Sequence, residues 1–376
     1  MDVVYMGDDM DTFLTFLLYT SVSLVAVVLF TKSCKCKNKH IRRVEFSLAI
    51  IIPSLLAGLR GSNVGSDTSM YIHEYYYPGT YRFGSGFTRT FELGYRTIRS
   101  LFMDLGFPHQ CFFFLMEALT LLFLFLAIKE EGQEANVNVA AYIYMFDAYF
   151  QSFNMLRQAL AVAIIIYSYT QLIRKKYIKW LILVVVAGLF HKTAWIFLIV
   201  IVAKYVLSKR NGKIYLAAGI AGICIMINNS SIVQKVATLF LGEKAIWYTS
   251  VVNTQSKLWV YLLKISPLVV LFVLCIKNYS KSNKKIVVYA GFALAGYVLA
   301  SYGNYVSTDA QRIALYLSRL DAIVLGYAVM KPLHFSGNKC FKPKHVRYAI
   351  YCYFIIMYIY NYFYLGVSSI VPYSIV

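Results

Sequence analysis

The sequence predicts an all-α, polytopic membrane protein that forms one integral membrane domain over residues 1–376. Hydrophobic residues make up 59% of the chain and charged residues only 14%, so there is too little polar surface to cover a soluble globule. Apolar runs of about bilayer-spanning length recur along the whole chain. Lysine-rich loops separate several of these runs, as is typical of multi-pass membrane proteins.

About twelve apolar segments have roughly spanning length, and we expect them to be transmembrane helices. Several are short enough to be tilted, or broken near a cavity. In chain order the segments cover residues 12–31, 44–59, 107–128, 137–150, 155–173, 178–190, 194–205, 214–227, 258–276, 286–302, 313–330 and 348–365.

The charge of the loops predicts the orientation of the helices. The twelve segments place five lysine-rich loops on one side of the membrane, and the positive-inside rule makes that side cytoplasmic. Both termini are then expected outside. Topology accounts for the charge of these short loops, so no nucleic-acid binding is expected. The five loops cover residues 32–43, 173–179, 204–213, 277–285 and 331–347.

The largest loop on the outer side covers residues 60–106. It opens with RGSNVGSDTSMY, which predicts a tight polar turn around Asp67. Over residues 86–106 apolar residues recur at spacings of three and four, which predicts an amphipathic helix on the outer membrane surface. Arg89, Arg96 and Arg99 are expected away from its apolar side. An interfacial aromatic belt, with arginines against lipid headgroups, is the alternative interpretation of this region.

Two predicted helices begin at the outer face with an arginine as their third residue. Asn154 can cap the helix that carries Arg157, and Asp309 can cap the helix that carries Arg312. A cation in the first turn opposes the helix dipole at a cost of up to ~1 kcal/mol. A bound anion removes that cost, because backbone N–H groups and the guanidinium then point at one charge.

Local ion pairing is the alternative explanation for these two arginines. Asp147 can neutralise Arg157, and either Asp309 or Asp321 can neutralise Arg312. The spacing alone does not choose between a bound anion and a neighbouring carboxylate.

Polar residues also occur within or beside otherwise apolar stretches. Arg312, Tyr316 and Arg319 fall at i, i+4 and i+7 of one segment. An intramembrane arginine costs ~3 kcal/mol on insertion scales, so this stripe is expected to face a wet cavity. His191 and Lys192 fall between two segments and predict a tight outer turn, on the same side as the arginine-led helix starts.

Five short motifs occur in order along most of the chain: GLRGSNVGSDTSMY at residues 58–71, FELGY at 91–95, FNMLRQALA at 153–161, LFHKTAW at 189–195 and RIALY at 312–316. Their order and spacing resemble the EpsG/Wzy family of bacterial polysaccharide polymerases. Ser66 stands where the family often has threonine, and the C-terminal part of the chain carries no matching motif.

The resemblance implies a glycosyltransferase of GT-C-like architecture in the bacterial inner membrane, with its active site facing the periplasm or exterior. It would transfer a growing glycan from undecaprenyl diphosphate to another lipid-linked repeat unit at the outer leaflet. Its partners would be lipid-linked oligosaccharides, membrane lipids and a chain-length regulator. The outer acidic residues are scattered, so the reaction is expected to need no metal ion or other cofactor.

The resemblance also suggests roles for single residues. As a hypothesis, Arg157 and Arg312 hold diphosphates and stabilise charge as the glycosyl bond breaks, because a planar guanidinium binds phosphate oxygens in pairs. The acceptor hydroxyl needs a base, for which His191 is preferred over Asp67, with Glu92 a third candidate. Residues expected to contact the substrate are Arg60, Tyr71, Glu92, Gln158, Lys192, Tyr316 and Arg319.

The sequence is also compatible with two other membrane functions. A polysaccharide transporter or lipid flippase would need ionisable residues near the membrane midplane, where the chain offers Glu117, Lys264, Arg319 and Asp321. A membrane acyltransferase that modifies surface sugars would also use a histidine and many helices. It does not explain two helices that begin with arginine.

Overall fold

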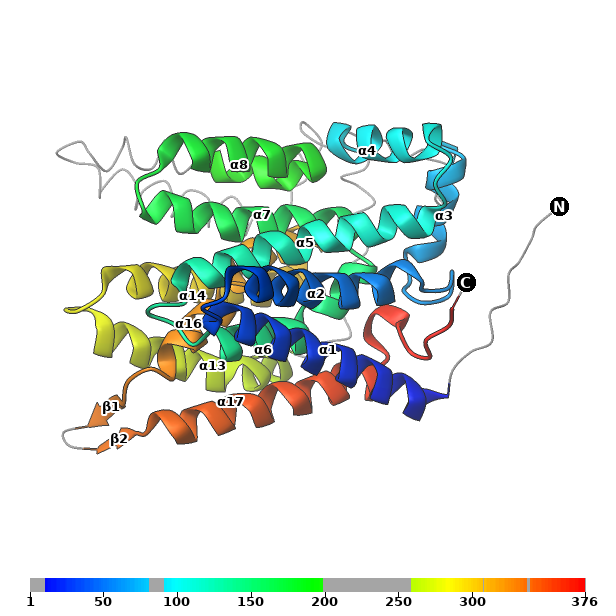
Figure 1. Ribbon diagram of the computed structural model, residues 1–376. Coiled ribbons are helices and arrows are strands. Elements are labelled where there is room, and N and C mark those ends of the chain that lie inside the picture. The colour runs from blue at the N-terminus through cyan, green and yellow to red at the C-terminus, as the bar shows by residue number, and fades with distance from the viewer. Residues whose placement is uncertain (1–10, 81–90, 199–257, 307, 337–338, 376) are drawn as a thin grey trace.

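The computed structural model describes residues 11–80, 91–198, 258–306, 308–336 and 339–375. Most of this part of the chain is helical (Figure 1), which confirms the expected all-α class. The strands in it are β1 (Leu333–Ser336) and β2 (Lys339–Phe341), which pair as a short antiparallel hairpin.

The longer helices of the first half of the chain pack against one another. In Figure 1, α1 lies against α2, α2 against α5, α5 against α7, and α7 against α8. The shorter α3 and α4 lie at one end of this group. These helices are α1 (Thr12–Lys35), α2 (Lys39–Gly58), α3 (Thr68–Tyr76), α4 (Leu93–Asp104), α5 (His109–Glu131), α6 (Val137–Asp147), η1 (Tyr149–Phe153), α7 (Leu156–Ile173), α8 (Tyr177–Phe190) and η2 (Lys192–Leu198).

The second half of the chain packs as a further layer of helices. The pairs α13 with α14 and α14 with α15 are in contact, while α16 and α17 pack against α6. Its helices are α13 (Leu258–Tyr279), α14 (Lys284–Val306), α15 (Thr308–Ser318), α16 (Asp321–Ala328), α17 (Pro343–Tyr358), the π-helix η3 (Ile359–Tyr364) and η4 (Val367–Ser369).

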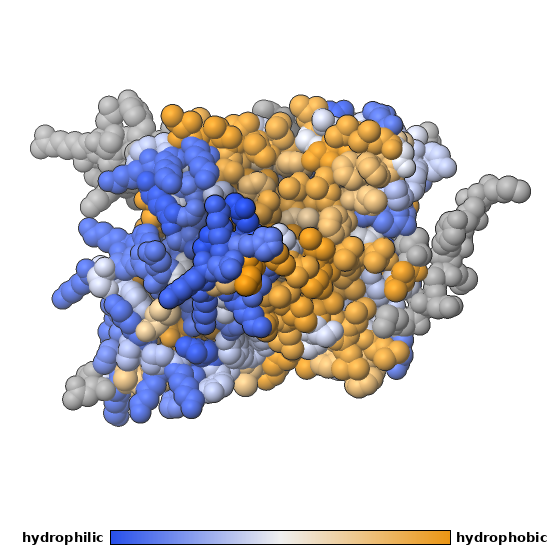
Figure 2. All heavy atoms as spheres, in the orientation of Figure 1, coloured by the Kyte–Doolittle hydropathy of each residue, from blue (hydrophilic) through white to orange (hydrophobic). Residues whose placement is uncertain are grey.

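Five of the described helices are long and apolar enough to cross a membrane: α1, α5, α7 and parts of α13 and α14. Of these, α7 is buried over most of its length, whereas only a third or less of each apolar stretch in α1, α13 and α14 is buried. Hydrophobic residues cover much of the face of the bundle seen in Figure 2. The chain therefore has the character of an integral membrane protein. The predicted segment at 214–227 lies outside the described residues, and twelve spans with a GT-C-like architecture stay a prediction.

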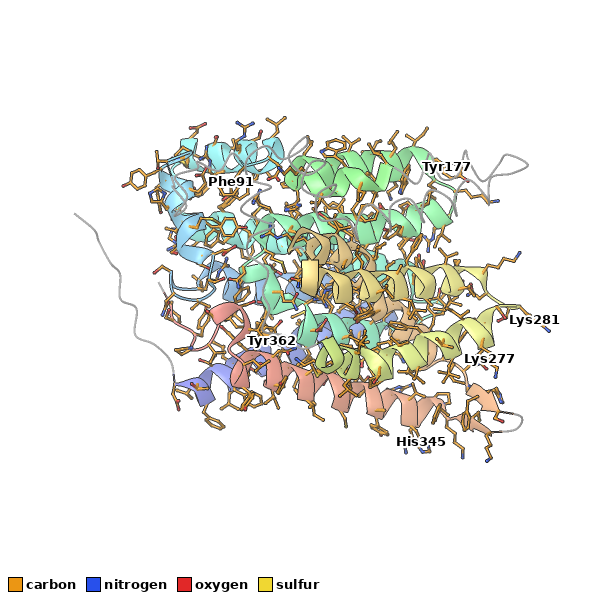
Figure 3. All side chains as sticks on the ribbon, turned by 180° about the vertical axis from the view of Figure 1, so that it is seen from behind. Phe91, Tyr177, Lys277, Lys281, His345 and Tyr362 are labelled. Atoms are coloured by element: carbon orange, nitrogen blue, oxygen red, sulfur yellow. The ribbon has the colours of Figure 1, made fainter. Side chains whose placement is uncertain are left out.

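The two ends of the bundle differ in hydropathy (Figure 2). Hydrophilic residues gather at the end that carries the β1–β2 hairpin and the turns joining α1 to α2, α7 to α8, and α13 to α14 (Figures 1 and 2). Lys277, Lys281 and His345 lie there, whereas Phe91 lies at the opposite end (Figure 3). Four of the five lysine-rich loops thus share one end, and the fifth, 204–213, lies outside the described residues.

The predicted segment 313–330 is not one helix. It is divided into α15 and α16 at Arg319 and Leu320. The side chains on either side of this break have partners on different elements: Arg319 pairs with Asp147, whereas Asp321 accepts a hydrogen bond from Tyr297, 2.6 Å away, and one from the backbone N–H of Ala322. Satisfying both charges favours a break over a continuous helix.

Candidate active site at the start of α7

Arg157, the second residue of α7, lies at the centre of a buried polar cluster. Its guanidinium forms an ion pair with Glu92, the residue before α4, and only 4% of the arginine side chain is exposed. The guanidinium also lies 4.2 Å from the ring centre of Phe91 and 5.8 Å from that of Tyr95. The ring of Tyr71 lies 6.1 Å from that of Phe91, centre to centre. Residues from the motifs at 58–71, 91–95 and 153–161 therefore lie together around the Arg157 guanidinium.

The close approach of α4 to α8 brings Glu92 to this position. A Cβ atom added to Gly94 would lie 2.9 Å from the carbonyl oxygen of Leu189, so a larger residue does not fit without moving the backbone. At the end of α8 the chain turns at His191, and the backbone N–H of Lys192 donates to Glu92 across 3.3 Å. One carboxylate thereby contacts both the α7 arginine and the predicted histidine turn.

His191 belongs to a chain of polar contacts next to this ion pair. Its Nδ1 atom lies 2.6 Å from Thr193 Oγ1, and that hydroxyl lies 3.1 Å from the hydroxyl of Tyr316 on α15. His191 is 7% exposed and Tyr316 is fully buried. The structure thus brings together His191 and Tyr316, which lie in distant motifs, while the side chain of Lys192 is exposed.

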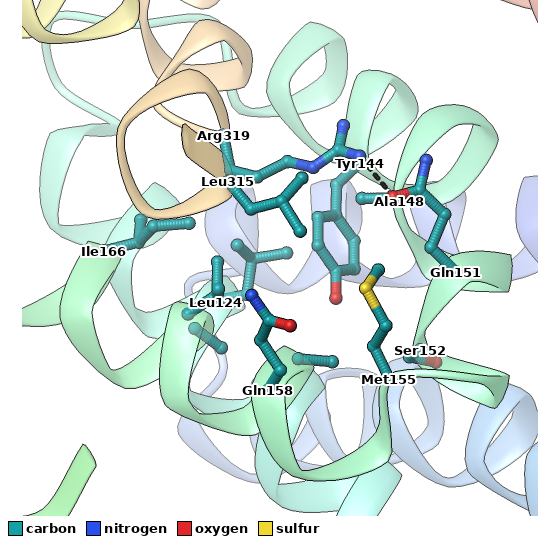
Figure 4. A pocket seen from close by; sticks show the side chains of 13 residues that line it. Leu124, Tyr144, Ala148, Gln151, Ser152, Met155, Gln158, Ile166, Leu315 and Arg319 are labelled. Carbon is teal, nitrogen blue, oxygen red and sulfur yellow. Dashed lines mark hydrogen bonds between the residues drawn. The ribbon is translucent and has the colours of Figure 1, made fainter. Parts of the chain in front are cut away.

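A second ion pair involves Arg319, the residue after α15. Arg319 forms an ion pair with Asp147 and donates to Gln151 Oε1 across 2.7 Å (Figure 4). Gln158 and Arg319 line a cavity of about 30 Å³ there, which has room for water but not for a sugar. The Gln158 amide also donates to the backbone carbonyl of Arg312 across 2.8 Å.

Arg60 is fully buried and hydrogen-bonds only within the protein. It donates to the carbonyls of Ala57 and Phe153 and to Thr68 Oγ1, and it stacks on Phe113 with the guanidinium 4.4 Å from the ring centre. Burial lowers the pKa of Arg60 to about 10. In this geometry the hydrogen bonds of Arg60 hold the turn that precedes α3.

Asn154 does not cap α7, contrary to the prediction. The residue before α7 is Met155, and no side chain caps that helix. Instead Asn154 Nδ2 donates to the carbonyl of Ser368 across 2.8 Å, while its Oδ1 accepts from the N–H of Asp67 across 3.4 Å. Asn154 therefore ties the Asp67 turn to the C-terminal segment, because both present backbone groups that need partners.

The predicted carboxylate partners of the two arginines also need correction. Asp147 pairs with Arg319 and not with Arg157, whose partner is Glu92. The carboxylate of Asp321 accepts hydrogen bonds from Tyr297 and from the backbone N–H of Ala322. The side chain of Asp309 lies outside the described residues, and α15 begins one residue before it.

Arg99 lies inside the protein, although the amphipathic pattern predicted it on the polar side of its helix. It is 7% exposed, donates to the Glu74 carbonyl across 3.0 Å, and lies 3.7 Å from a carboxylate oxygen of the same residue. Arg96, one turn away, is exposed as predicted, and Arg89 lies outside the described residues. The apolar pattern missed Arg99 because an ion pair, and not hydrophobicity, holds it inside.

Sequence reasoning also missed the contribution of the C-terminus to this region. The N–H groups of Gly61, Gly65 and Ser66 donate to carbonyls of Ser374, Ser369 and Ser368 over 2.8–3.1 Å. Gly65 has a φ of +101°, and a Cβ there would lie 2.7 Å from Asn154 Oδ1. Backbone contacts carry no side-chain signature, so no motif in the C-terminal part indicated them.

A family model for the EpsG family matches residues 43–375, nearly the whole chain. The chain belongs to the EpsG family. Membership supports a polysaccharide-polymerase type of role for this integral membrane protein. The comparison with curated proteins found no match, and neither did the comparison with solved structures.

The EpsG family match covers every residue of the buried cluster around Arg157. Among the described residues of this EpsG-family chain, no three His, Cys, Asp or Glu side chains are grouped to hold a metal ion.

Proposed function

We propose that this EpsG-family protein joins lipid-linked oligosaccharides at the outer leaflet of the bacterial inner membrane. A growing glycan on undecaprenyl diphosphate would be transferred to the sugar of another lipid-linked repeat unit. The observation that carries the proposal is the buried Arg157–Glu92 pair, which lies beside His191. Arg157 packs on Phe91, and Phe91 lies toward the end of the bundle opposite Lys277 and Lys281 (Figure 3). That end would face the exterior if the positive-inside rule holds.

In the proposed reaction, Glu92 holds Arg157 in place until the substrate arrives. Diphosphate oxygens then take the position of the carboxylate on the guanidinium, since both anions present oxygen pairs that match the planar fork. The acceptor hydroxyl attacks the anomeric carbon, and the bond from that carbon to the diphosphate oxygen breaks. Arg157 stabilises the negative charge that develops on the leaving diphosphate, with Arg312 and Arg319 in supporting roles.

The acceptor hydroxyl loses its proton during this attack. We propose His191 as the base, because Thr193 and Tyr316 hold its Nδ1 side in a defined orientation and an imidazole can accept a proton from a sugar hydroxyl. Asp67 and Glu92 are the other candidates. Asp67 lies in the turn that Asn154 supports, and would instead orient a sugar hydroxyl.

Substitution of Arg157 tests the proposal directly. Arg157→Lys keeps the positive charge but loses the paired N–H donors, so it is expected to shorten the surface glycan and to slow polymerisation of lipid-linked repeats by the purified protein. Exposed Arg96 provides the control, because Arg96→Ala removes a cation from the same region without touching the cluster. Single lipid-linked repeats should accumulate on the outer leaflet, whereas loss of a flippase would hold them inside.

The choice of base has its own test. His191→Ala should abolish polymerisation at normal protein levels, while Asp67→Asn should retain part of it. A normal rate and normal polymer length in His191→Ala, with both lost in Asp67→Asn, would overturn the assignment of His191. Unaltered glycan ladders in Arg157→Lys and Arg157→Ala would overturn the proposed function itself.

A further inference from the structure

Glu117 is a buried acid on α5 that the proposed reaction does not use. It is 1% exposed and forms no ion pair with any described residue. Its Oε2 atom lies 2.6 Å from Ser152 Oγ, and its Oε1 atom has no hydrogen-bond partner in the described part of the chain. An ionised carboxylate with so few donors would be costly in this position.

A second buried acid on the same helix shows how an ionised carboxylate is accommodated. Glu131, 2% exposed, accepts a hydrogen bond from Tyr327 across 2.6 Å and one from Tyr289 across 3.2 Å, and it pairs with Lys285 at 3.2 Å. Two hydroxyl donors and a cation therefore face Glu131. Glu117 has one hydroxyl, so the two glutamates are in opposite environments on one helix.

The hydrogen bonds of Ser152 indicate the protonation state of Glu117. Ser152 Oγ lies 2.6 Å from Glu117 Oε2 and also 2.6 Å from the carbonyl oxygen of Tyr149. A serine hydroxyl has one hydrogen to donate, whereas carboxylate and carbonyl oxygens only accept. An ionised Glu117 would leave one of these short contacts without a hydrogen. A carboxylic acid supplies it: Glu117 donates to Ser152, and Ser152 donates to Tyr149.

The charged and titratable groups around Glu117 do not replace this hydrogen. They are Arg60, Tyr144 and Tyr149. Arg60, the cation among them, donates to the carbonyls of Ala57 and Phe153 and to Thr68. No described hydrogen bond joins any of the three to the carboxyl group of Glu117.

We propose that Glu117 is a protonated carboxylic acid in the folded protein and a positioning residue for η1. The hydrogen-bond chain fixes η1, whose Phe153 carbonyl receives Arg60 and whose Gln151 receives Arg319. The next helix along the chain is α7, which carries Arg157. The protonation of Glu117 does not depend on the reaction. The importance of positioned arginines for polymerisation rests on the proposed function.

Infrared difference spectroscopy of the full chain in lipid nanodiscs tests the protonation. The carbonyl band of a protonated carboxyl group at neutral pH should be present in the wild type and lost in Glu117→Gln. The matched control is Glu131→Gln, which should leave that band in place because Glu131 is ionised. The proposal that Glu117 is protonated is overturned if the band persists in Glu117→Gln, or if the wild type has no such band.

A pH profile of thermal unfolding and polymerisation tests the positioning role. The amide introduced by Glu117→Gln is a permanent donor, so this variant should match the wild type at neutral pH, while Glu117→Ala should lower both the unfolding temperature and the polymerisation rate. In alkaline buffer the wild type should lose activity as Glu117 ionises, and Glu117→Gln should keep it. Equal losses in Glu117→Gln and Glu117→Ala overturn the positioning role. Failure of the Arg157 experiment alone leaves the infrared result standing, so the two proposals fail separately.

Discussion

At the scale of single residues, the ion pair between Arg157 and Glu92 dominates the candidate site. The side chains are 4% and 14% exposed, so water solvates neither charge well. Pairing offsets the cost of burying both charges, but a partner left alone in such a site is strongly destabilising. This asymmetry makes the pair testable by removing one charge and then both.

Glu92→Gln is expected to destabilise the protein by about 3–5 kcal/mol, because it leaves a buried guanidinium without a counter-charge. Chemical denaturation of the detergent-solubilised chain measures the change. The double variant Glu92→Gln with Arg157→Met should recover most of the loss, since it removes the remaining buried charge. An unfolding midpoint equal to that of the wild type in the single variant would show that the pair does not contribute to stability.

At the scale of secondary-structure elements, the contact between α4 and α8 positions Glu92 near both Arg157 and the histidine turn. Gly94 permits this contact, because its position faces the backbone of Leu189 at a distance that excludes a side chain. A helix on the membrane surface was expected here, and the structure shows that α4 also packs against α5 and α8. The position of a buried carboxylate thus depends on one glycine.

Gly94→Ala is expected to move α4 away from α8 and to reduce the polymerisation rate by up to about 100-fold, in line with the effect of displacing a reacting group by about 1 Å. The measurement is the rate with purified protein and lipid-linked repeats. Gly291→Ala is the matched control: a Cβ there meets no atom within 4 Å, so the activity should not change. A normal polymerisation rate in Gly94→Ala would show that the close α4–α8 contact is not needed for activity.

At the scale of the whole molecule, the distribution of charge predicts a single orientation in the membrane. Lys277, Lys281 and His345 lie at one end, and Phe91 of the candidate site lies toward the other (Figure 3). The C-terminal segment packs beside α1 and α2 near that second end: Tyr19 donates to the carbonyl of Ile370 across 2.6 Å, and Tyr373 to that of Leu56 across 2.8 Å.

Labelling with a membrane-impermeant thiol reagent is expected to show this orientation. Cys340 in β2 should react only after the cells are permeabilised, because the lysine-rich end would face the cytoplasm. An introduced cysteine at exposed Ser62, in the turn before α3, should react in intact cells. The opposite pattern would place the candidate site on the cytoplasmic side and contradict the outer-leaflet reaction.

The helices themselves were largely predictable from the sequence. The predicted segments 12–31, 107–128 and 155–173 correspond to α1, α5 and α7 with differences of a few residues, because a long apolar run in a membrane chain forms a helix that satisfies its own backbone. The break at Arg319 was not predictable in this way, since it depends on Asp147 and Tyr297 from other elements.

By itself, the sequence determined the membrane character, the helical class and the motifs that assign the chain to its family, because apolar length and motif spacing are local properties. Only the tertiary structure decided that Glu92 is the partner of Arg157, that Arg60 is enclosed and that Glu117 has a single hydroxyl beside it. The physical reason is that ion pairs and hydrogen bonds depend on distances between helices, and residues far apart in the chain supply the two sides of each contact.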